Sequence, residues 1–341
     1  MGTVTVRDVA RRAGVSISTV SRALAAPERV ALTTRERVIA AVSELGYRPN
    51  RAASGLRGGR TGTVGLMVPD IENPYFASVT KGVGARARAQ GYSLFVVDTA
   101  EHPELEAEEV RTLAAQTDGV LLASPRTDDA LIRTVAASRP CVLLNRRITL
   151  SPTGAGPEIA SVTADETRGT RQAIEHLYAL GHRRIAFVGG PERSWSQARR
   201  AAGIRAAVEA VGGIEYTELG PYRPQVDGGY SAADVAYASG ATAVLAFNDL
   251  VATGLLSRWH ERGIGVPGDI SVVAFDDTYV TRLAAPRLSS VGPDLHQMGA
   301  AAIDLLLAMI RGDEPSSQVE LRPALSVRGS TGPVNRMRSG S

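Results

Sequence analysis

The sequence predicts an α/β protein with a small all-helical head, and two observations carry this prediction. From residue 63 onward, apolar runs rich in valine, isoleucine and leucine alternate with helical patterns, which is typical of parallel sheets covered on both faces. The alternation runs through two successive series, which indicates two similar lobes. Residues 1–60 instead carry only short helical patterns. A chain of 341 residues is long enough for two or three domains.

Charge is distributed unevenly along the chain. Residues 1–60 hold eleven arginines against four acidic residues, a net charge of +7, whereas the remainder carries −4. A small basic head on a mildly acidic body predicts that the head meets a polyanion. The chain has no apolar run of membrane-spanning length and no signal-peptide pattern, so we expect it in the cytoplasm. Its one cysteine, Cys141, is expected as a buried strand thiol.

The first two helices of the head have clear boundaries in the sequence. Thr5 is placed to cap the first helix, with Asp8 as its capping-box partner, and Gly14 is placed to end it. Ser16 is placed to cap the second helix, Ile17–Ala25. The three-residue turn between the two helices makes them a helix-turn-helix.

A third helix and a linker complete the head. Thr33 and Glu36 are placed to open this helix, and Gly46 to end it. Residues 48–62 are basic and rich in glycine, which is typical of a linker. Within it, "NRAASGL" is able to form a short helix if something stabilises it.

The core elements follow one another in a regular order. The first series reads "TVGLMVPD", a helix near 75–90, "YSLFVVDT", a helix near 104–116, "GVLLAS", a helix near 128–138 and "CVLLN". The second series reads "SVTAD", a helix near 167–180, "RIAFVGG", a helix near 197–211, "AVLAFND", a helix near 249–262 and "ISVVAFDD". We therefore expect "SVTAD" to open the second lobe.

Motifs for catalysis are not found in the sequence. "GLRGGRTG" lacks the Gly-Lys-Ser/Thr of a phosphate loop, and no glycine fingerprint follows the first strand of either lobe. The five histidines have neither metal-ligand spacing nor a nucleophile beside them; His176 and His182 are expected at a helix end, solvated or stabilising the helix dipole. We predict no catalytic residue, no metal site and no cofactor.

Polar and aromatic residues gather where the predicted strands end. Ligands of open α/β sheets bind at the carboxyl ends of strands. The residues at these ends are Asp70, Asn73, Tyr75, Phe76, Asn145, Arg146, Asp165, Asn248, Asp249, Asp276 and Asp277. Carboxylates, amides, an arginine and aromatic rings suit a polyhydroxylated ligand. Any one of these residues alone equally suits a helix cap or a turn.

Seven stretches together resemble one known family. They are "TVRDVARRAGVSISTVSRAL", "TRERVIAAVSELGYRPNRAASGL", "VGLMVPDIENPYF", "ALGHRRIAFVGGP", "FNDLVATGLL", "GVPGDISVVAFDD" and "LSSVGPD". In this order they resemble the lactose-repressor (LacI) family of transcription regulators, over nearly all of residues 3–330. The resemblance implies a periplasmic-binding-protein-like core behind the helix-turn-helix head.

The resemblance also implies domain boundaries. The head spans 1–60, with a hinge helix at about residues 50–58, and the core spans 61–330. Lobe one would comprise 61–161 and 293–320, and lobe two 162–290 and 323–330. The flexible tail, 331–341, has no heptads, so a homodimer is expected rather than a tetramer.

The family's DNA contacts carry over to residues of the head and linker. The second helix would lie in the major groove of operator DNA, where Ile17, Ser18 and Arg22 match base-reading positions, and an arginine there reads guanine. The other matching DNA contacts are Thr5, Ser16, Thr19, Ser21, Thr34, Tyr47 and Asn50. Leu56 matches a leucine that wedges between base pairs in the minor groove, and Arg57 is expected to add a phosphate or minor-groove contact.

The family's effector site carries over to residues of the core. Tyr75 and Phe76 match cleft aromatics, Arg200 the arginine that binds the effector, and Tyr222 an aromatic that stacks on it. The remaining candidates for effector contacts are Asn73, Asn145, Asp165, Trp195, Asn248 and Asp276. Trp195 suits packing equally well, and Asp165 suits a helix cap equally well.

The prediction is a repressor that binds a palindromic operator as a homodimer under allosteric control by a small molecule, with a sugar favoured over a purine. One alternative is a two-lobed solute-binding protein, which would need a signal sequence and no basic head. Another is an α/β enzyme with an appended DNA-binding module, which would need a nucleophile–base pair or a cofactor loop.

Overall fold

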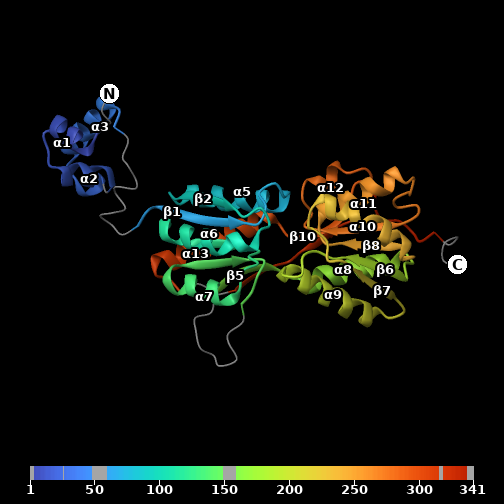
Figure 1. Ribbon diagram of the computed structural model, residues 1–341. Helices are drawn as coiled ribbons and strands as arrows, with labels where there is room; N and C mark the ends of the chain where they lie inside the picture. The colour runs from blue at the N-terminus through green and yellow to red at the C-terminus, as the bar shows by residue number, and fades with distance from the viewer. Residues whose placement is uncertain (1–3, 26, 48–59, 149–158, 315–317, 336–341) are drawn as a thin grey trace. The chain divides into compact units, whose positions relative to one another are not determined.

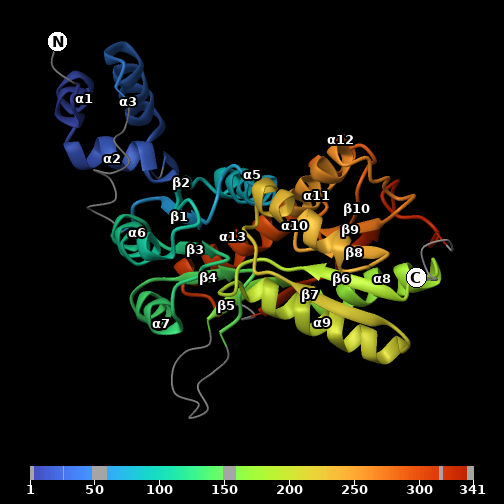
Figure 2. The same ribbon diagram turned by 45° about the vertical axis from the view of Figure 1, so that its right-hand side comes forward.

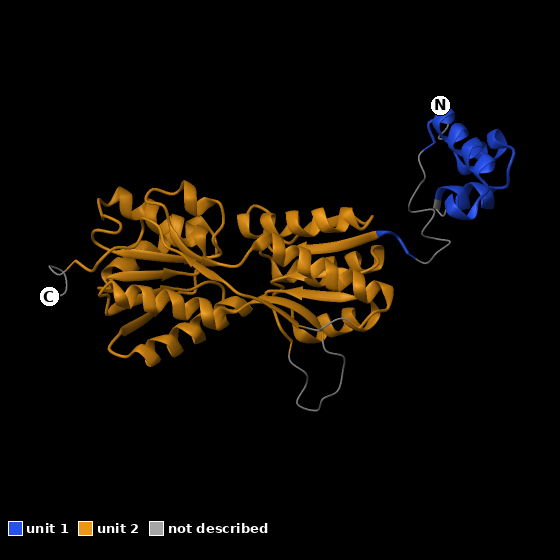
Figure 3. Cartoon of the chain, turned by 180° about the vertical axis from the view of Figure 1, so that it is seen from behind, with its two compact units in different colours: residues 1–62 blue, residues 63–341 orange. Residues whose placement is uncertain are grey.

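The protein forms two compact units, residues 1–62 and residues 63–341 (Figure 3). The computed structural model describes residues 4–25, 27–47, 60–148, 159–314 and 318–335. Each unit has a hydrophobic core of its own. The expected hinge helix at about residues 50–58 lies outside the described residues. None of the described helices is both long and apolar enough to cross a membrane.

Short helices build the first unit, and local capping sets their ends. They are α1 (Val6–Ala13), α2 (Ile17–Ala25), the 3-10 turn η1 (Pro27–Arg29) and α3 (Leu32–Leu45). The Asp8 carboxylate accepts hydrogen bonds from the Thr5 amide at 2.9 Å and the Thr5 hydroxyl at 2.7 Å. Gly14 ends α1 in the left-handed conformation, with φ +62°. Ser16 Oγ accepts from the Thr19 amide at 3.1 Å, so the caps expected for α1 and α2 are confirmed.

The third helix begins earlier than expected. Its N-cap is Ala31, whose carbonyl already accepts from the amides of Thr34 and Arg35, both at 3.0 Å. Thr33 therefore lies inside the first turn and does not cap the helix. Gly46 ends the helix in the left-handed conformation, as expected. The apolar faces of the three helices meet in the core of the head, which buries Val9, Ala10, Ala13, Val20, Ala23, Val38 and Ala41.

The second unit contains two six-stranded sheets, and the first of them is entirely parallel. Its order is β11-β5-β4-β3-β1-β2. The strands are β1 (Thr63–Val68), β2 (Ser93–Asp98), β3 (Val120–Ala123), β4 (Cys141–Leu144), β5 (Ala160–Ala164) and β11 (Gln318–Leu321). Two helices pack on one face of this sheet, α5 (Pro74–Ala89) and α13 (Leu295–Arg311). Two others pack on the opposite face, α6 (Pro103–Gln116) and α7 (Asp129–Ser138).

The second sheet has the order β12-β10-β9-β8-β6-β7, and only β12 is antiparallel. Its strands are β6 (Arg184–Val188), β7 (Glu215–Leu219), β8 (Ala243–Ala246), β9 (Ser271–Phe275), β10 (Ser289–Gly292) and β12 (Ala324–Ser326). The helices are α8 (Glu166–Ala179), α9 (Trp195–Val211), α10 (Val226–Ala238), α11 (Asp249–Glu261) and the short α12 (Val280–Leu283). In Figure 1 and Figure 2, α10 and α11 lie on one face of the sheet, and α8 and α9 lie on the other.

Within the described residues the chain passes between the lobes three times, and the first crossing corrects the expected boundary. Strand β5 pairs with β4 and β11 up to Ala164, so "SVTAD" is the last strand of the first lobe's consecutive series and not the start of the second lobe. The division expected at residues 161 and 162 is therefore wrong by a few residues. Asp165 N donates to the Leu321 carbonyl at 2.9 Å, so the crossing lies between β5 and Glu166, where α8 begins. The other crossings follow β10 and β11.

Candidate functional site

The carboxyl ends of the strands in both sheets surround one cavity. It contains about 370 Å³ of empty space, its open mouth included. Seven of the predicted effector contacts line it: Asn73, Tyr75, Phe76, Asn145, Arg200, Asn248 and Asp276. The other lining residues are Glu101, Ser124, Arg126, Ser194, Ser196, Pro224 and Phe247. We call this space the inner cavity.

Arg200 of α9 lies at the inner cavity between two carboxylates, those of Glu166 and Asp276. Its Nε donates to Glu166 at 3.1 Å, and its Nη2 donates to Glu166 at 3.3 Å and to Asp276 at 3.0 Å. Its Nη1 donates to the carbonyl of Phe247 at 2.5 Å. Burial lowers the pKa of Arg200, but the two carboxylates outweigh this effect and leave the pKa raised. The guanidinium therefore stays charged, with only 7% of its side chain exposed.

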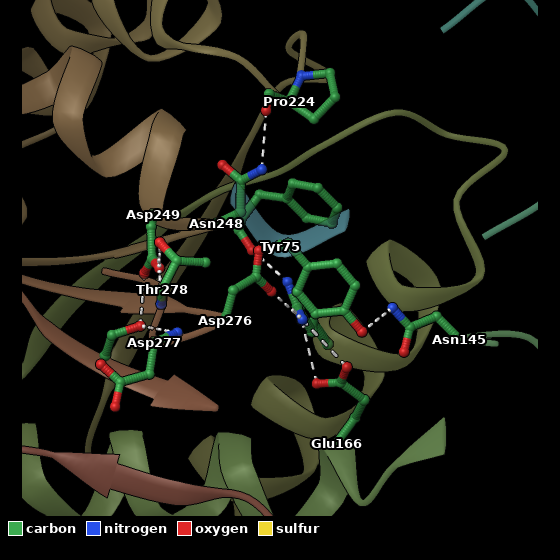
Figure 4. Close-up of polar contacts among 12 residues, drawn as sticks. Tyr75, Asn145, Glu166, Pro224, Asn248, Asp249, Asp276, Asp277 and Thr278 are labelled. Carbon is green, nitrogen blue, oxygen red and sulfur yellow. Dashed lines mark hydrogen bonds and ion pairs between the residues drawn. The ribbon is translucent and has the colours of Figure 1, made fainter. Parts of the chain in front are cut away.

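The carboxylates of Asp276 and Asp249 have different roles: Asp276 lines the inner cavity, and Asp249 does not. Burial raises the pKa of Asp276, although Arg200 acts against this shift. Asp249 faces away from the cavity lining: it accepts from the amide and hydroxyl of Thr278 at 2.7 and 2.8 Å and from the Ser290 hydroxyl at 2.7 Å (Figure 4). Burial, and then the charge of Asp276, raise the pKa of Asp249. Asp249 thus anchors the loop that presents Asp276.

Two further polar residues at strand ends have structural roles. Asp277 accepts from the Ser326 hydroxyl at 2.7 Å and pairs with Arg328 at 2.7 Å. Arg146 donates to the carbonyls of Pro125 and Thr127, both at 2.7 Å. Both side chains hold loops, and neither lines the inner cavity.

The first lobe contributes a buried aromatic pair and two amides. Tyr75 and Phe76 meet edge to face, with ring centroids 5.1 Å apart. The Tyr75 hydroxyl accepts from Asn145 Nδ2 at 2.5 Å and donates to the sulfur of Met298 at 3.0 Å. Burial raises the pKa of Tyr75, so the hydroxyl stays protonated and able to donate. Asn73 caps α5 by accepting from the Tyr75 amide at 3.0 Å.

A second arginine–carboxylate pair was not predicted from the sequence. Arg126 donates to Glu101 at 2.5 Å, and their side chains are 6% and 14% exposed. Glu106 accepts from the backbone amides of Arg126 and Thr127, both within hydrogen-bonding distance, at 2.8 and 2.7 Å. Burial raises the pKa of Glu106 despite these hydrogen bonds. Glu101 follows β2 and Arg126 follows β3, so the rule used at the other strand ends, applied to these two strands, finds both residues.

Four lining residues have left-handed backbone conformations. The φ angles are +59° at Glu101, +45° at Ser124, +53° at Asn145 and +104° at Asp276. This conformation is uncommon for residues other than glycine and tends to cluster at functional sites. All four residues follow strands, so the strained turns lie where the chain leaves each sheet for the cavity.

Three predicted effector residues do not line the inner cavity. Asp165 caps α8 by accepting from the Arg168 amide at 2.9 Å. Trp195 is the first residue of α9, and its ring lies 5.8 Å from the guanidinium carbon of Arg199. Tyr222 lines a second cavity adjoining the first. Asn248 does line the inner cavity and also caps α11, accepting from the Val251 amide at 2.8 Å.

Most of the predicted DNA contacts that the structure describes lie on α2 or at its start, whereas Thr34 lies in α3 and Tyr47 follows it. Ser16, Ser18 and Arg22 are exposed, as is Thr5 at the start of α1. The partly buried candidates are Ile17, Thr19, Ser21, Thr34 and Tyr47. The Ser16 hydroxyl bonds those of Ser18 and Thr19, both at 2.8 Å. Three candidates, Asn50, Leu56 and Arg57, lie outside the described residues.

The arginines of the head fall into two groups. Arg11 pairs with Asp8 within α1, and Arg12 pairs with Glu44 at 2.7 Å, which joins α1 to α3. Within the described part of the head, Arg22 makes no ion pair. Its charge is therefore available to a partner outside the unit.

Comparisons with known proteins agree with both units. The model of bacterial regulatory proteins of the lacI family matches residues 5–50, and that of a periplasmic binding protein-like domain matches residues 174–331. The transcriptional regulator DegA of Bacillus subtilis (strain 168) is 32% identical over 339 residues, covering 97% of this chain and 99% of DegA.

Two solved structures are similar over almost the whole chain. The lac repressor dimer bound to operator and the anti-inducer ONPF has a TM-score of 0.84 and 30% identity, covering 97% of this chain and 100% of that one. A complex of the transcriptional regulator CelR with cellobiose has a TM-score of 0.70 and 32% identity, covering 96% and 99%. With a helix-turn-helix head, a two-lobed core and relatives that match from end to end, the chain belongs to the LacI family of DNA-binding transcriptional regulators.

Proposed function

We propose that this protein is a repressor that binds a palindromic operator as a homodimer and responds to an uncharged sugar in the inner cavity. The lac repressor, which is similar along the whole chain, was solved as a dimer on operator DNA. A regulator of this kind acts in the cytoplasm and binds its ligand without a catalytic step. The relatives found are themselves regulators, which supports this proposal over an enzyme with a DNA-binding module.

Helix α2 is the proposed reading helix. Arg22 is exposed and without an ion pair among the described residues of the head, so it suits a bidentate contact with a guanine edge. The hydroxyls of Ser16, Ser18 and Thr19 gather at the start of the same helix, where phosphates also find backbone N–H groups. On sequence grounds, Leu56 remains a proposed minor-groove wedge and Arg57 a proposed phosphate or minor-groove contact.

The observation that favours an uncharged ligand is the pairing of both arginines in the inner cavity. Arg200 lies between Glu166 and Asp276, and Arg126 pairs with Glu101. A phosphate or carboxylate ligand would have to displace a buried carboxylate and would add another negative charge beside those that remain. Sugar hydroxyls instead accept from the guanidinium groups and donate to the carboxylates, and they leave each pair intact.

The shape of the cavity also suits a sugar ring. Tyr75, Phe76 and Phe247 offer apolar surface for the C–H faces of a ring, beside the polar groups of Asn145 and Asp276. CelR, a relative of similar fold, was solved with the sugar cellobiose. A nucleoside would also need hydrogen-bond donors and acceptors arranged along one edge of its base, whereas the polar groups here come from several directions around the cavity.

Glu166 connects the ligand cavity to the segment where the chain passes from the first lobe to the second. It is the first residue of α8 and follows β5 of the first lobe by only two positions. A ligand that contacts Arg200 or Asp276 therefore acts on the segment where the chain changes lobes. Coupling of this kind typically amounts to about 1–3 kcal/mol between ligand and DNA binding.

A ligand screen tests the class of effector. The melting temperature of the full-length protein would be measured with neutral sugars, their phosphates, sugar acids and nucleosides. A ligand at about 100 times its dissociation constant stabilises a protein by about 2.7 kcal/mol, which raises the melting temperature by a few degrees. We expect at least one neutral sugar to do so and its phosphate not to. Stabilisation by phosphates or nucleosides alone contradicts the proposal.

A further inference from the structure

Of the arginines that line the inner cavity, Arg126 has fewer partners than Arg200. Arg200 contacts two carboxylates and a backbone carbonyl. The guanidinium of Arg126 contacts one carboxylate, that of Glu101, at 2.5 Å, and no other ion pair or hydrogen bond of this guanidinium is found in the described parts of the chain. Removal of the Glu101 charge would therefore leave a buried guanidinium without the carboxylate that neutralises it.

The backbone around Arg126 is fixed from two sides. Glu106 accepts hydrogen bonds from the Arg126 amide at 3.0 and 2.8 Å and from the Thr127 amide at 2.7 Å. Arg146 donates to the carbonyls of Pro125 and Thr127, both at 2.7 Å. The turn between β3 and α7 is thus held through its amides and through its carbonyls. We therefore expect Arg126 to stay at the cavity when its side chain loses its partner.

Glu101 is held in place as well. Its amide donates to the Pro69 carbonyl at 2.6 Å, and its side chain is 14% exposed. Its φ of +59° is a conformation that asparagine adopts more readily than glutamate. A glutamate here opposes the preference of the backbone and brings a charge into a mostly buried place. This combination indicates that the position has a function that requires the carboxylate.

The charges around this pair nearly balance. In the first lobe, Glu101, Glu106 and Asp129 carry three negative charges when ionised, against the two positive charges of Arg126 and Arg146. The local sum is −1, and it becomes 0 when Glu101 is replaced by a neutral residue. An anion that approaches Arg126 in the wild-type protein has to displace the Glu101 carboxylate and meets a negative surrounding.

A second cavity gives access to this pair. Arg126 and Glu101 line it together with residues of the second lobe, whereas Arg200 and its two carboxylates do not. The charged residues that the second lobe adds carry both signs: they are Glu192, Arg193 and Arg223, and Arg223 pairs with Asp227 at 2.8 Å. Apart from Glu101, this cavity therefore has no acidic excess that would repel an anion from Arg126.

We propose that Glu101 is a specificity-determining residue, which excludes anionic ligands by occupying Arg126. Glu106 and Arg146 act as positioning residues, because they fix the turn that carries Arg126. This inference rests on the proposed function, since it assumes that the natural ligand is uncharged. It goes further by assigning the exclusion of anions to one carboxylate, and it implies that phosphate binds at Arg126 once this carboxylate is removed.

A gain of phosphate binding tests the proposal without knowledge of the natural ligand. Glu101→Gln removes the charge and keeps the size of the side chain. The melting temperature of the full-length protein would be followed in a titration with inorganic phosphate, with sodium chloride keeping the ionic strength constant. Phosphate stabilises proteins in general, so the difference from wild type is the measured quantity. We expect a saturable rise in Glu101→Gln that exceeds the rise in wild type by a few degrees.

Further variants locate the effect and control for it. The double variant Glu101→Gln, Arg126→Gln is expected to lose the additional rise, because the guanidinium is absent. Glu104→Gln is the matched control: it removes the same charge from a nearby acid that is 67% exposed and lines neither cavity, so it should behave as wild type. Glu101→Asn suits the left-handed backbone and should show the same gain as Glu101→Gln, which keeps the test available if the glutamine variant does not fold.

The outcomes separate this inference from the proposed function. An equal rise in wild type and in the variants of residue 101, or an additional rise that persists without Arg126, overturns the role of Glu101. Either result leaves the binding of a neutral sugar by the wild-type protein standing. Saturable stabilisation of the wild-type protein by phosphates, with no neutral sugar stabilising it, contradicts the proposed function itself.

Discussion

Arg200 donates two hydrogen bonds to Glu166, at 3.1 and 3.3 Å, and this pair joins the ligand cavity to the first residue of α8. The family resemblance implied a ligand contact at Arg200 but did not imply a role for Glu166. The pair is almost completely buried, with side chains that are 7% and 6% exposed. It therefore bears on stability, on the choice of ligand and on communication between the lobes.

The stability prediction concerns Glu166→Gln. Removing the charge leaves Arg200 with a single buried carboxylate, Asp276, so we expect the free energy of unfolding to fall by about 1–3 kcal/mol. Glu175→Gln, on the same helix, removes an acid that is 58% exposed and 3.9 Å from Arg171. Its expected cost is below about 0.5 kcal/mol. Urea denaturation measures the free energy of unfolding of both variants. An equal decrease in the two would show that the buried pair stabilises the protein no more than an exposed one.

The response to ligand is expected to depend on Arg200. Arg200→Lys keeps the positive charge but cannot reproduce the hydrogen bonds to Glu166, Asp276 and the Phe247 carbonyl together. We expect the effect of the ligand on operator affinity to fall about tenfold or more, with ligand-free operator affinity nearly unchanged. Arg199→Lys, on the neighbouring exposed residue, serves as the control. A full response in Arg200→Lys would mean that another residue couples the ligand to the lobes.

Sequence reading by the head is assigned to Arg22. Arg22→Ala is expected to weaken operator binding by about 1–3 kcal/mol more than it weakens binding to random DNA. Anisotropy titrations of both DNAs at one salt concentration measure this difference. Arg11→Ala, which removes an arginine that pairs with Asp8, is expected to affect the two DNAs alike. If Arg22→Ala also weakens both equally, Arg22 contacts only the backbone.

A pH prediction concerns His182, which was expected near a helix end as a solvated or dipole-stabilising residue. The solvated alternative is wrong: the imidazole is buried, with Nδ1 3.0 Å from the Thr242 hydroxyl and Nε2 3.1 Å from both the Ser271 hydroxyl and the Gly332 carbonyl. Burial is the main cause that lowers the pKa of His182, and the charges of His176 and Arg183 lower it further. The unfolded chain therefore binds this proton more readily than the folded chain.

Stability should accordingly fall as the pH drops below about 6.5, the usual histidine pKa, toward the lower pKa of the folded state. The raised pKa of Asp276 acts in the opposite direction, so the comparison has to be between variants. Urea denaturation between pH 7.5 and 5.5 is expected to show a weaker pH dependence in His182→Gln than in wild type. His260→Gln, at an exposed histidine, should behave as wild type. An unchanged dependence in His182→Gln contradicts the assignment.

The head was predictable because its signals are local. Thr5, Asp8, Gly14 and Ser16 act within a few residues of themselves, and the structure confirms each of these caps. The elements of the core were harder to predict from the sequence. Strand β5 looks like the start of a new series, because nothing in its sequence tells which sheet it will join. Strand β7 is half-exposed and polar, and α10 has two glycines in its first turn, so neither has a strong apolar pattern.

The cavity could be predicted only in part, for a physical reason. Asp249, Asp276 and Asp277 all follow strands, yet only Asp276 lines the cavity. Their roles depend on partners far away in the sequence, such as Ser290 for Asp249 and Arg328 for Asp277. Glu166 escaped notice because a charged residue in the first turn of a helix is ordinary there.

The most direct test of the whole account is the operator affinity of the full-length protein with and without a saturating neutral sugar. The operator would be selected from a random palindromic library, and the sugar would be the best ligand from the screen. We expect the sugar to change operator affinity by about 5- to 150-fold, the range that a coupling of 1–3 kcal/mol produces. Identical affinities, with the sugar shown to be bound, would contradict the claim that the inner cavity controls the head.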